Sequence, residues 1–409
     1  MKGPRMQVDR RRFLIGSSVV AALGVAGGAT AWSVEELTAT AVEHPRADGD
    51  GVVVIVTLYG GNDGINTVIP YSDNAYHDAR PELAYAEDDV LHLDGQLGLN
   101  PAMTGLHDLW GAGSLAIVRG VGYPKPDHSH FRSMDIWQTA SPSEPVHTGW
   151  IGRWLDATGD DPLRAVNVGS VLPSLAVGER ATAAALNTSG TPLAAASVAT
   201  LAALGARSAS DSAAESMVCA SYAAEKVASG TFSPLLGGSS SRGGTGGRGH
   251  GGQSLADQLA VVGRCVKAGV ATRVYSVQLG GFDTHADERG TQQKLLGELD
   301  AALSGFLADM RTDPRGRDVV VMAYSEFGRR VRANASEGTD HGTAGPVFVA
   351  GAPVRGGFYG DEPSLTDLDV GDLKVTTDFR DVYAELLARG IGTDPTPAVG
   401  AGRKPVGFL

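Results

Sequence analysis

The chain has 409 residues, enough for one large domain or two of ordinary size. Hydrophobic residues make up 42% of it and charged residues 20%, and 56 glycines indicate many glycine-rich loops, so the composition is that of a globular protein. The net charge of −12 argues against nucleic acid as a partner, because a phosphate backbone would be repelled. Cys219 and Cys265 cannot build a disulfide framework; they form one bridge or stay free and buried, and we expect the buried, free state.

Residues 1–31 resemble a twin-arginine secretory signal. Arginines at positions 10–12 precede Phe13 and Leu14, an apolar run continues to Ala29, and small residues at 29–31 offer a cleavage site. The run is too rich in Gly and Ser for a membrane anchor, and no Cys follows it for lipid attachment. We therefore expect the twin-arginine export machinery as a partner, no membrane span after signal cleavage, and a periplasmic or extracellular location.

Residues 32–50 indicate a polar linker, and residues 51–409 one α/β domain. Apolar, β-branched runs predict strands, and amphipathic patterns predict helices between them. In chain order we expect a strand at 52–58, a helix at 101–111, a strand at 114–118, helices from Ser129 and at 149–157, a strand at 164–168, a helix at 254–268, a strand at 271–280, a helix after His285, strands at 318–324 and 346–350, and a helix at 377–387. This alternation predicts a mostly parallel central sheet with helices on both faces.

One stretch, residues 174–252, differs in composition from the rest. Ala and Ser dominate its first part, and Gly and Ser dominate residues 237–252. We expect a helical insertion that ends in a flexible linker.

In the helix from Ser129, we expect Phe131, Met134 and Trp137 to point inward.

Acidic and imidazole side chains follow the ends of several expected strands. In open α/β sheets ligands bind beyond the carboxyl ends of the strands, and Asp, Glu and His are ligands of divalent metals. The sequence therefore predicts a metal site, with Asp340 as a residue that orients a ligand. The predicted ligands are Asp63, Asp283, His285, Glu326 and His341.

These residues also have structural interpretations. Asp283 can cap the following helix and leave His285 merely exposed, and Asp340 can close a turn with its own backbone. Glu326 follows a fully apolar run, where a carboxylate needs a cation or a hydrogen-bond partner. An ion pair with Arg329 or Arg330 would meet that need without any metal.

Ser129 stands between His128 and His130 where a helix is expected to begin. Amide groups at a helix N-terminus can hold an oxyanion, and either a flanking imidazole or a metal can activate the hydroxyl. The alternative is an N-cap serine in a solvated loop. We expect Ser129, His128 and His130 to be catalytic. The residues expected to hold an anionic small-molecule substrate are Arg132, Arg329 and Arg330.

Five motifs together resemble the twin-arginine-exported domain-of-unknown-function 1501 (DUF1501) family, from about residue 52 to 390 apart from the insertion. They are Gly60–Asn66, His128–Phe131, Gly280–His285, Ser325–Arg329 and Thr339–Gly342. The family is similar in turn to the alkaline phosphatase and sulfatase superfamily. That resemblance implies an alkaline-phosphatase-like core, a metal-binding aspartate at Asp63, a serine nucleophile at Ser129, and metal ligands at Asp283, His285 and His341.

The resemblance implies an exported metal-dependent hydrolase of phosphate or sulfate esters, with zinc as its metal and calcium, magnesium or manganese as alternatives. Phe327 departs from the pattern, because it stands where the superfamily has a metal-binding histidine and a phenyl ring cannot ligate. Three outcomes are open. One metal remains at Asp283, His285 and His341; a harder second ion is held by oxygens of Asp63, Ser129 and Glu326; or the site is degenerate and serves binding or assembly.

Overall fold

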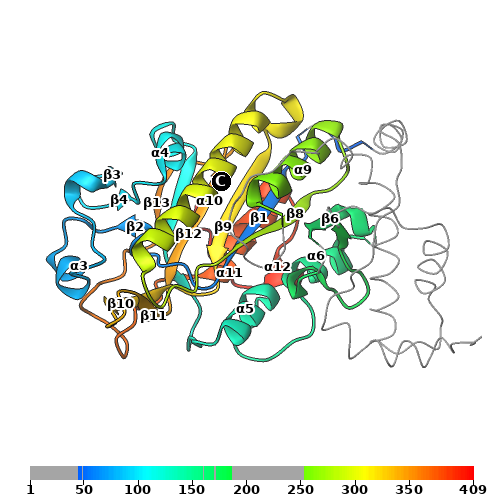
Figure 1. Ribbon diagram of the computed structural model, residues 1–409. Coiled ribbons are helices and arrows are strands. Elements are labelled where there is room, and N and C mark those ends of the chain that lie inside the picture. Colours follow the sequence, from blue (N-terminus) through cyan, green and yellow to red (C-terminus); the bar gives the residue numbers. More distant parts are fainter. Residues whose placement is uncertain (1–44, 48, 160, 170–171, 187–252) are drawn as a thin grey trace, which may run out of the picture.

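The structure is a computed structural model that describes residues 45–47, 49–159, 161–169, 172–186 and 253–409 (Figure 1). The expected twin-arginine signal, most of the linker, most of the insertion and Cys219 lie outside these residues. Cys265 is free and buried in α9 (Leu255–Ala268), where burial raises the pKa of its thiol. Within the described part of the chain, no helix combines the length and the apolar character needed to cross a membrane.

A mixed, mostly parallel sheet lies at the centre. In spatial order it contains β13 (Gly357–Tyr359), β5 (Leu115–Gly122), β12 (Gly345–Gly351), β9 (Val319–Ser325), β1 (Val52–Tyr59), β8 (Val274–Gly280), β6 (Ala165–Val168) and β7 (Ala184–Leu186), and β14 (Thr377–Asp378) also pairs with β5. Strand β1 is parallel to β8 and β9, whereas β12 is antiparallel to β5 and β9. The predicted α/β class with a mostly parallel sheet is confirmed.

Helices cover both faces of this sheet (Figure 1). Alternate side chains of β1 point to opposite faces, as the period of two in a strand requires, so Val54 and Val56 join one core and Val53 and Ile55 the other. Burial on both faces explains why the strand is apolar throughout. The first core also contains α4 (Thr104–Gly111), α9 and α10 (Glu288–Arg311), and the second contains α5 (His130–Thr139), α6 (Trp150–Thr158), α11 (Phe379–Glu385) and α12 (Thr396–Val399).

Short elements complete the described chain. A third apolar cluster joins residues 65–90 to the hairpin of β10 (Arg329–Ala333) and β11 (Thr339–His341). The remaining elements are β2 (Val68–Ile69), β3 (Leu91–His92) and β4 (Gly98–Leu99), helix α3 (Asn74–Ala79), the π-helix η5 (Leu386–Ile391), and the 3-10 turns η1 (Glu87–Asp89), η2 (Pro162–Arg164), η3 (Ser174–Ala176) and η4 (Pro314–Gly316). Strands β2, β3 and β4 were not predicted, because two residues are too few to show a periodic pattern.

Two expectations about local structure are wrong. Residues 184–186 form β7 and pair in parallel with β6, so the sheet continues past residue 174, where the insertion was expected to begin. Phe131 is 91% exposed, although Met134 and Trp137 are buried as expected. Phe131 follows His130 in the first turn of α5, where successive side chains point about 100° apart, and it is His130 that turns toward the neighbouring strands.

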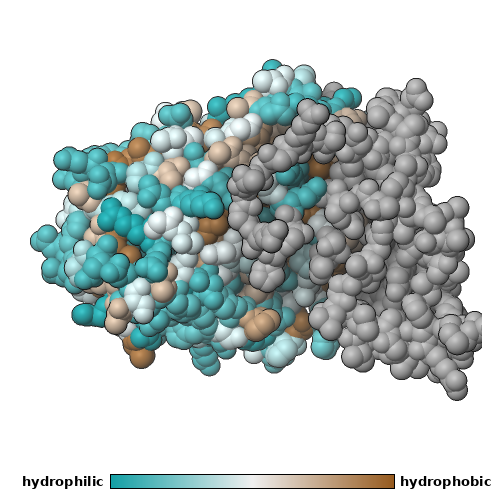
Figure 2. Space-filling model, in the orientation of Figure 1, coloured by the Kyte–Doolittle hydropathy of each residue, from teal (hydrophilic) through white to brown (hydrophobic). Residues whose placement is uncertain are grey.

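On the face seen in Figure 2, hydrophobic residues are scattered among hydrophilic ones.

The directions of the strands determine where the polar side chains predicted to form the site gather. The carboxyl ends of β1, β5, β8 and β9 lie at one edge of the sheet, and the antiparallel strand β12 starts there. Loops after β1, β5, β8 and β9 and the segment before β12 therefore meet at this edge. They contain Asp63, Ser129, Asp283, Glu326 and His341, in that order along the chain.

The turn after β1 makes close contact with two of these loops. Gly60 and Gly61 have φ values of +116° and +71°, which favour glycine. A Cβ on Gly60 would lie 2.4 Å from the Asp283 amide nitrogen, and one on Gly61 would lie 2.2 Å from Cε2 of Phe327. Glycine at these two positions therefore lets three segments approach one another.

We expect Gly61→Ala to destabilise the fold by about 1–3 kcal/mol, because its methyl group overlaps the buried Phe327 ring. The measurement is the free energy of unfolding in urea. Gly111→Ala is the matched control: this glycine lies in α4 with open space around it, so alanine should be neutral or slightly stabilising. Equal stability of the Gly61→Ala protein and the wild type would contradict the close packing described here.

Candidate metal centre

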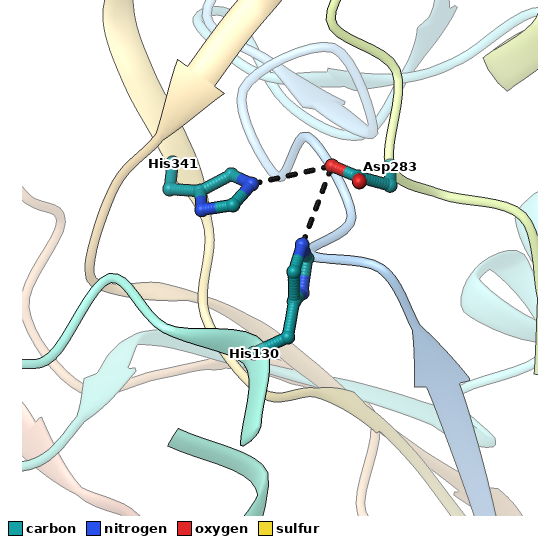
Figure 3. A group of neighbouring side chains, drawn as sticks. All are labelled: His130, Asp283 and His341. Atoms are coloured by element: carbon teal, nitrogen blue, oxygen red, sulfur yellow. Dashed lines mark hydrogen bonds and ion pairs between the residues drawn. The ribbon is translucent and has the colours of Figure 1, made fainter. Parts of the chain in front are cut away.

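His130, Asp283 and His341 come together at the sheet edge (Figure 3). Their ligand atoms all lie within 4.8 Å of one another. Asp283 Oδ1 is 3.2 Å from His341 Nε2 and 3.3 Å from His130 Nε2. These residues come from α5, from the loop after β8 and from β11, so only the fold brings them together.

His285 joins this group from the other side of the carboxylate. Its Nε2 lies 3.0 Å from Asp283 Oδ1 and 2.9 Å from His341 Nε2. The ligand atoms of His285 do not all lie within 4.8 Å of those of His130, Asp283 and His341, so His285 extends this group of three. We call His130, Asp283, His285 and His341 the metal centre.

The opposite nitrogen of each imidazole faces a hydrogen-bond acceptor. His341 Nδ1 donates to the carbonyl oxygen of His128 at 2.7 Å, and His130 Nδ1 donates to Glu326 Oε1 at 2.8 Å. His285 Nδ1 faces Asp340 Oδ1 at 3.6 Å, longer than a hydrogen bond. In the neutral rings of His130 and His341 the shorter contact is the one at Nδ1, so we assign the proton to Nδ1 and the lone pair to Nε2.

Lone pairs that face one another or a carboxylate are stabilised by a cation between them, either a metal ion or a proton. Nε2 of His130 is buried and makes no hydrogen bond to any described residue, although Asp283 Oδ1 lies 3.3 Å away. In a tetrahedral zinc site with bonds near 2.0–2.1 Å, neighbouring ligand atoms are on the order of 3.3 Å apart. The contacts of 2.9–3.3 Å to Asp283 and between His285 and His341 come close to that spacing. Imidazole and carboxylate ligands, with outer acceptors at Nδ1 of His130 and His341, fit a divalent metal.

Ionisation in the metal centre follows from these contacts. Partial burial alone would raise the pKa of Asp283, but its contacts with Arg329 and His341 outweigh it and lower the pKa to about 2. The hydrogen bond to Glu326 raises the pKa of His130, whereas burial lowers the pKa of His341. At neutral pH, Asp283 is therefore an anion that favours a bound cation.

Glu326 contacts Nδ1 of His130 and is not among the grouped ligand atoms of His130, Asp283 and His341, contrary to the expectation that it is a ligand. Its side chain is 2% exposed. The amide of Gly60 donates to Oε1 at 2.9 Å, and the Ser325 hydroxyl donates to Oε2 at 2.9 Å. The hydroxyl of Ser133 in α5 donates to the Glu326 carbonyl oxygen at 2.5 Å, which attaches the helix that carries His130. Glu326 therefore orients His130 through Nδ1.

Phe327 packs under two of the imidazoles. Its ring centroid lies 4.9 Å from that of His130 and 4.8 Å from that of His341, and the side chain is buried. As expected for a phenyl ring, it offers no ligand atom. Its position indicates a packing role, in which it limits how far either histidine can tilt.

Asp63 is not part of the metal centre, so its assignment as a ligand is wrong. Both carboxylate oxygens accept hydrogen bonds from the guanidinium of Arg80, and both side chains are fully buried. Arg80 also donates to the carbonyl oxygens of Val331 and Arg330 in β10. The alternative of a second ion held by Asp63, Ser129 and Glu326 is excluded, because Arg80 occupies the carboxylate of Asp63. No feature of residues 71–100 had suggested this role for Arg80.

The arginines expected to hold an anionic substrate have other partners. The Arg329 side chain is fully buried and donates to the carbonyl oxygens of Gly60, Gly61, Phe282 and Thr339 and to Asp283 Oδ1, so it is not available to a substrate. Arg132 pairs with Asp135 in the same helix. Arg330 Nε lies 3.4 Å from Asp372 Oδ1, but its side chain remains 40% exposed.

Ser129 and His128 lie on the outer side of His130. Ser129 is the N-cap residue of α5, is exposed, and its hydroxyl makes no hydrogen bond within the residues that the structure describes. His128 Nε2 faces Oδ2 of the buried Asp372 at 2.8 Å. Asp372 lies far along the chain, in a loop with no recognisable motif, so the sequence offered no signal for it.

The family of this chain can now be stated. The family described as "Protein of unknown function (DUF1501)" matches residues 180–401. The chain belongs to the DUF1501 family. The match includes the motifs that carry Asp283, His285, Glu326 and His341, and it starts after the one that carries His130.

Solved structures and curated proteins add little to this result. A protein of the alkaline phosphatase superfamily from Vibrio parahaemolyticus is similar in structure, with a TM-score of 0.42 and 10% sequence identity, over 96% of this chain and 78% of that one. No curated protein matches the chain.

We expect the protein to bind zinc at the metal centre, and expect His341→Ala or His130→Ala to lower the affinity at least about 100-fold, since each removes a donor. Competition with a chromophoric chelator measures the affinity. His107→Ala is the control, because His107 contacts a backbone carbonyl in another part of the molecule and should leave the affinity unchanged. If His341→Ala and His130→Ala both bind zinc with wild-type affinity, the assignment of these two histidines as metal ligands is contradicted.

Zinc affinity should rise with pH, because His130 must lose its proton before Nε2 can bind a cation. The charge of Glu326 holds that proton to higher pH, so Glu326→Gln should move the acidic limb of the affinity–pH curve to lower pH. The same variant should lower the affinity at alkaline pH roughly tenfold, because the ring is held less firmly. Titrations from pH 5 to 8 measure both effects, with Glu298→Gln on α10 as the control. An acidic limb that stays at the wild-type pH would contradict the role of Glu326.

Proposed function

We propose that this chain is an exported, metal-dependent hydrolase of phosphate or sulfate esters. The observation that carries the proposal is the convergence of three imidazole Nε2 atoms on one carboxylate oxygen, with hydrogen-bond acceptors at Nδ1 of His130 and His341. Zinc suits this donor set best, since catalytic zinc sites use histidine and carboxylate ligands. A bound divalent cation would supply Lewis-acid stabilisation of the negative charge on ester oxygens.

Export is the second part of the proposal. It is supported by the twin-arginine pattern in residues 1–31. That route carries folded proteins, which suits a protein whose metal ligands come from segments far apart in the chain. The proposed location is the periplasm or the cell exterior.

Ser129 is the proposed nucleophile, and His128 its base. The hydroxyl is exposed beside His130, at the start of a ten-residue helix whose first amides can stabilise an anion. His130 is already engaged by Glu326 and Asp283. His128 remains: Asp372 accepts from its Nε2–H, so its Nδ1 carries the lone pair that a base requires.

In the proposed step, Ser129 Oγ forms a bond to phosphorus or sulfur while its proton passes to His128 Nδ1. The bond from phosphorus or sulfur to the alcohol oxygen breaks, and that oxygen takes the proton from His128. Water then breaks the new bond to Oγ and releases phosphate or sulfate. Arg330, which is part-exposed, and Arg132 are the proposed contacts for the anionic group.

A second function is favoured by different observations. Asp63 is bound to Arg80, Arg329 is fully engaged by backbone carbonyls, and Phe327, which packs on two of the histidines, offers no ligand atom. A site with a single cation and few free cationic side chains would also suit an exported binding or assembly protein that has lost catalysis. This alternative requires that the metal centre bind zinc without turning over any ester.

Turnover of an aryl phosphate and an aryl sulfate by the zinc-loaded, exported protein tests the proposal. We expect Ser129→Ala to lower kcat at least about 10³-fold while zinc content stays equal to wild type. Ser141→Ala, at a partly exposed serine beyond the end of α5, should retain activity. If Ser129→Ala keeps its turnover, water rather than the serine attacks the ester. If the wild-type protein binds zinc and turns over neither ester, the binding or assembly function is the better account.

A further inference from the structure

Two carboxyl groups and one guanidinium are buried together beside the metal centre. Asp63 is 1% exposed, and Glu288 and Arg80 are fully buried. Arg80 binds both oxygens of Asp63, with Nη2 3.0 Å from Oδ1. The Glu288 carboxyl group is within hydrogen-bonding reach of Asp63. One positive charge thus faces two acids inside the protein.

The count of charges requires a proton on one of the acids. A buried carboxylate without a counter-ion is very costly, and Arg80 can neutralise only one. Because Arg80 contacts Asp63 with two nitrogens, Asp63 is the anion and Glu288 the neutral acid. Glu288 Oε1 supports this assignment: it is buried and would be an unpaired acceptor if ionised, whereas a proton on it can be donated to Asp63.

The directions of the pKa shifts agree with this assignment. Burial, followed by the charge of Asp63, raises the pKa of Glu288, against smaller opposing effects of Thr339 and Arg80. Burial alone would raise the pKa of Asp63, but Arg80 lowers it, with Glu288 and Arg329 contributing in the same direction.

The other oxygen of Glu288 reaches the segment that carries His341. The Thr339 hydroxyl donates to Glu288 Oε2 at 2.5 Å, and Thr339 lies two residues before His341 in β11. The amide of Glu288 donates to the Glu337 carbonyl oxygen at 3.0 Å, and the amide of Thr339 approaches the Thr284 carbonyl oxygen at 3.4 Å. Glu288 therefore connects the loop that carries Asp283 and His285 to the hairpin that ends in His341.

We propose that Glu288 is a positioning residue of the metal centre. It stays protonated in the folded protein, donates to Asp63 and accepts from Thr339, and so sets the position of His341 relative to Asp283 and His285. The inference rests on the proposed function, since it assigns Glu288 a role in holding the ligands of the same cation.

Zinc affinity tests the positioning role. Glutamine matches the neutral acid in shape, with an amide group that can donate to Asp63 and an oxygen that can accept from Thr339. Glu288→Gln should therefore keep the affinity within about threefold of wild type, and Glu288→Ala should lower it about 10–100-fold. Thr339→Ser should behave like wild type and Thr339→Val like Glu288→Ala. The control is Glu298→Gln, which lies on the same helix. Wild-type affinity in Glu288→Ala, or an equal loss in Glu288→Gln, would overturn the role.

The pH dependence of stability tests the protonation state without any metal. In excess chelator, a glutamate that is protonated when folded and ionised when unfolded makes the wild type lose stability as pH rises above the ordinary glutamate pKa. This loss ends at the raised pKa of the folded state. Glutamine has no such loss, so from pH 5 to 8 the folding constant of Glu288→Gln should gain on wild type by up to about tenfold per pH unit.

The outcomes separate the two proposals. If the difference in folding free energy between wild type and Glu288→Gln does not change with pH, Glu288 is ionised in the folded protein. That result overturns the inference, whether or not the protein binds zinc. Asp63 is ionised in both folded and unfolded states over this range, and the histidines are common to both proteins, so neither alters the difference. If stability follows the expected pH dependence but no variant or wild type binds zinc, the proposed function fails while the protonation of Glu288 stands.

Discussion

The structure around the metal centre depends on the guanidinium group of Arg329. This buried group donates hydrogen bonds to carbonyl oxygens after β1, after β8 and at the start of β11, and it also binds Asp283 Oδ1. These segments have no regular secondary structure in common, and their carbonyls point into the interior. Buried carbonyls need donors, and a planar group with five N–H bonds can serve several of them at once. Arg329 thereby determines where Asp283 stands and how far β11 lies from the loop after β8.

Around Asp283, outer acceptors decide what the histidines can do. Glu326 and the carbonyl of His128 face Nδ1 of His130 and His341, which leaves the Nε2 lone pairs directed at an anionic oxygen. Such an arrangement is unfavourable without a cation, because acceptors then face acceptors. The Phe327 ring packs against the rings of His130 and His341. Phe327 offers no ligand atom and supplies a packing surface for the two histidines.

The revised roles of Asp63 and Glu326 have one physical cause. Both carboxylates follow apolar strands at the expected edge, and both are almost completely buried. A buried carboxylate binds whichever donor lies closest. For Asp63 that donor is Arg80, which comes from an irregular stretch, and for Glu326 the donors are an amide, a hydroxyl and an imidazole. Spacing along the chain cannot distinguish a carboxylate that faces a metal from one that faces a guanidinium, because both stand at the same place in the topology.

The sequence by itself determined the α/β class, the long strands and helices, the family, and the sheet edge at which the polar residues gather. These features depend on local hydrophobic patterns and on motifs of a few adjacent residues, which can be recognised along the chain. The tertiary structure alone decided that His130 joins Asp283, His285 and His341, that Asp372 faces His128, and that Arg80 and Glu288 hold Asp63. Each of these contacts joins segments far apart in the chain, and no periodic pattern records which of several equivalent charges will be neighbours after folding.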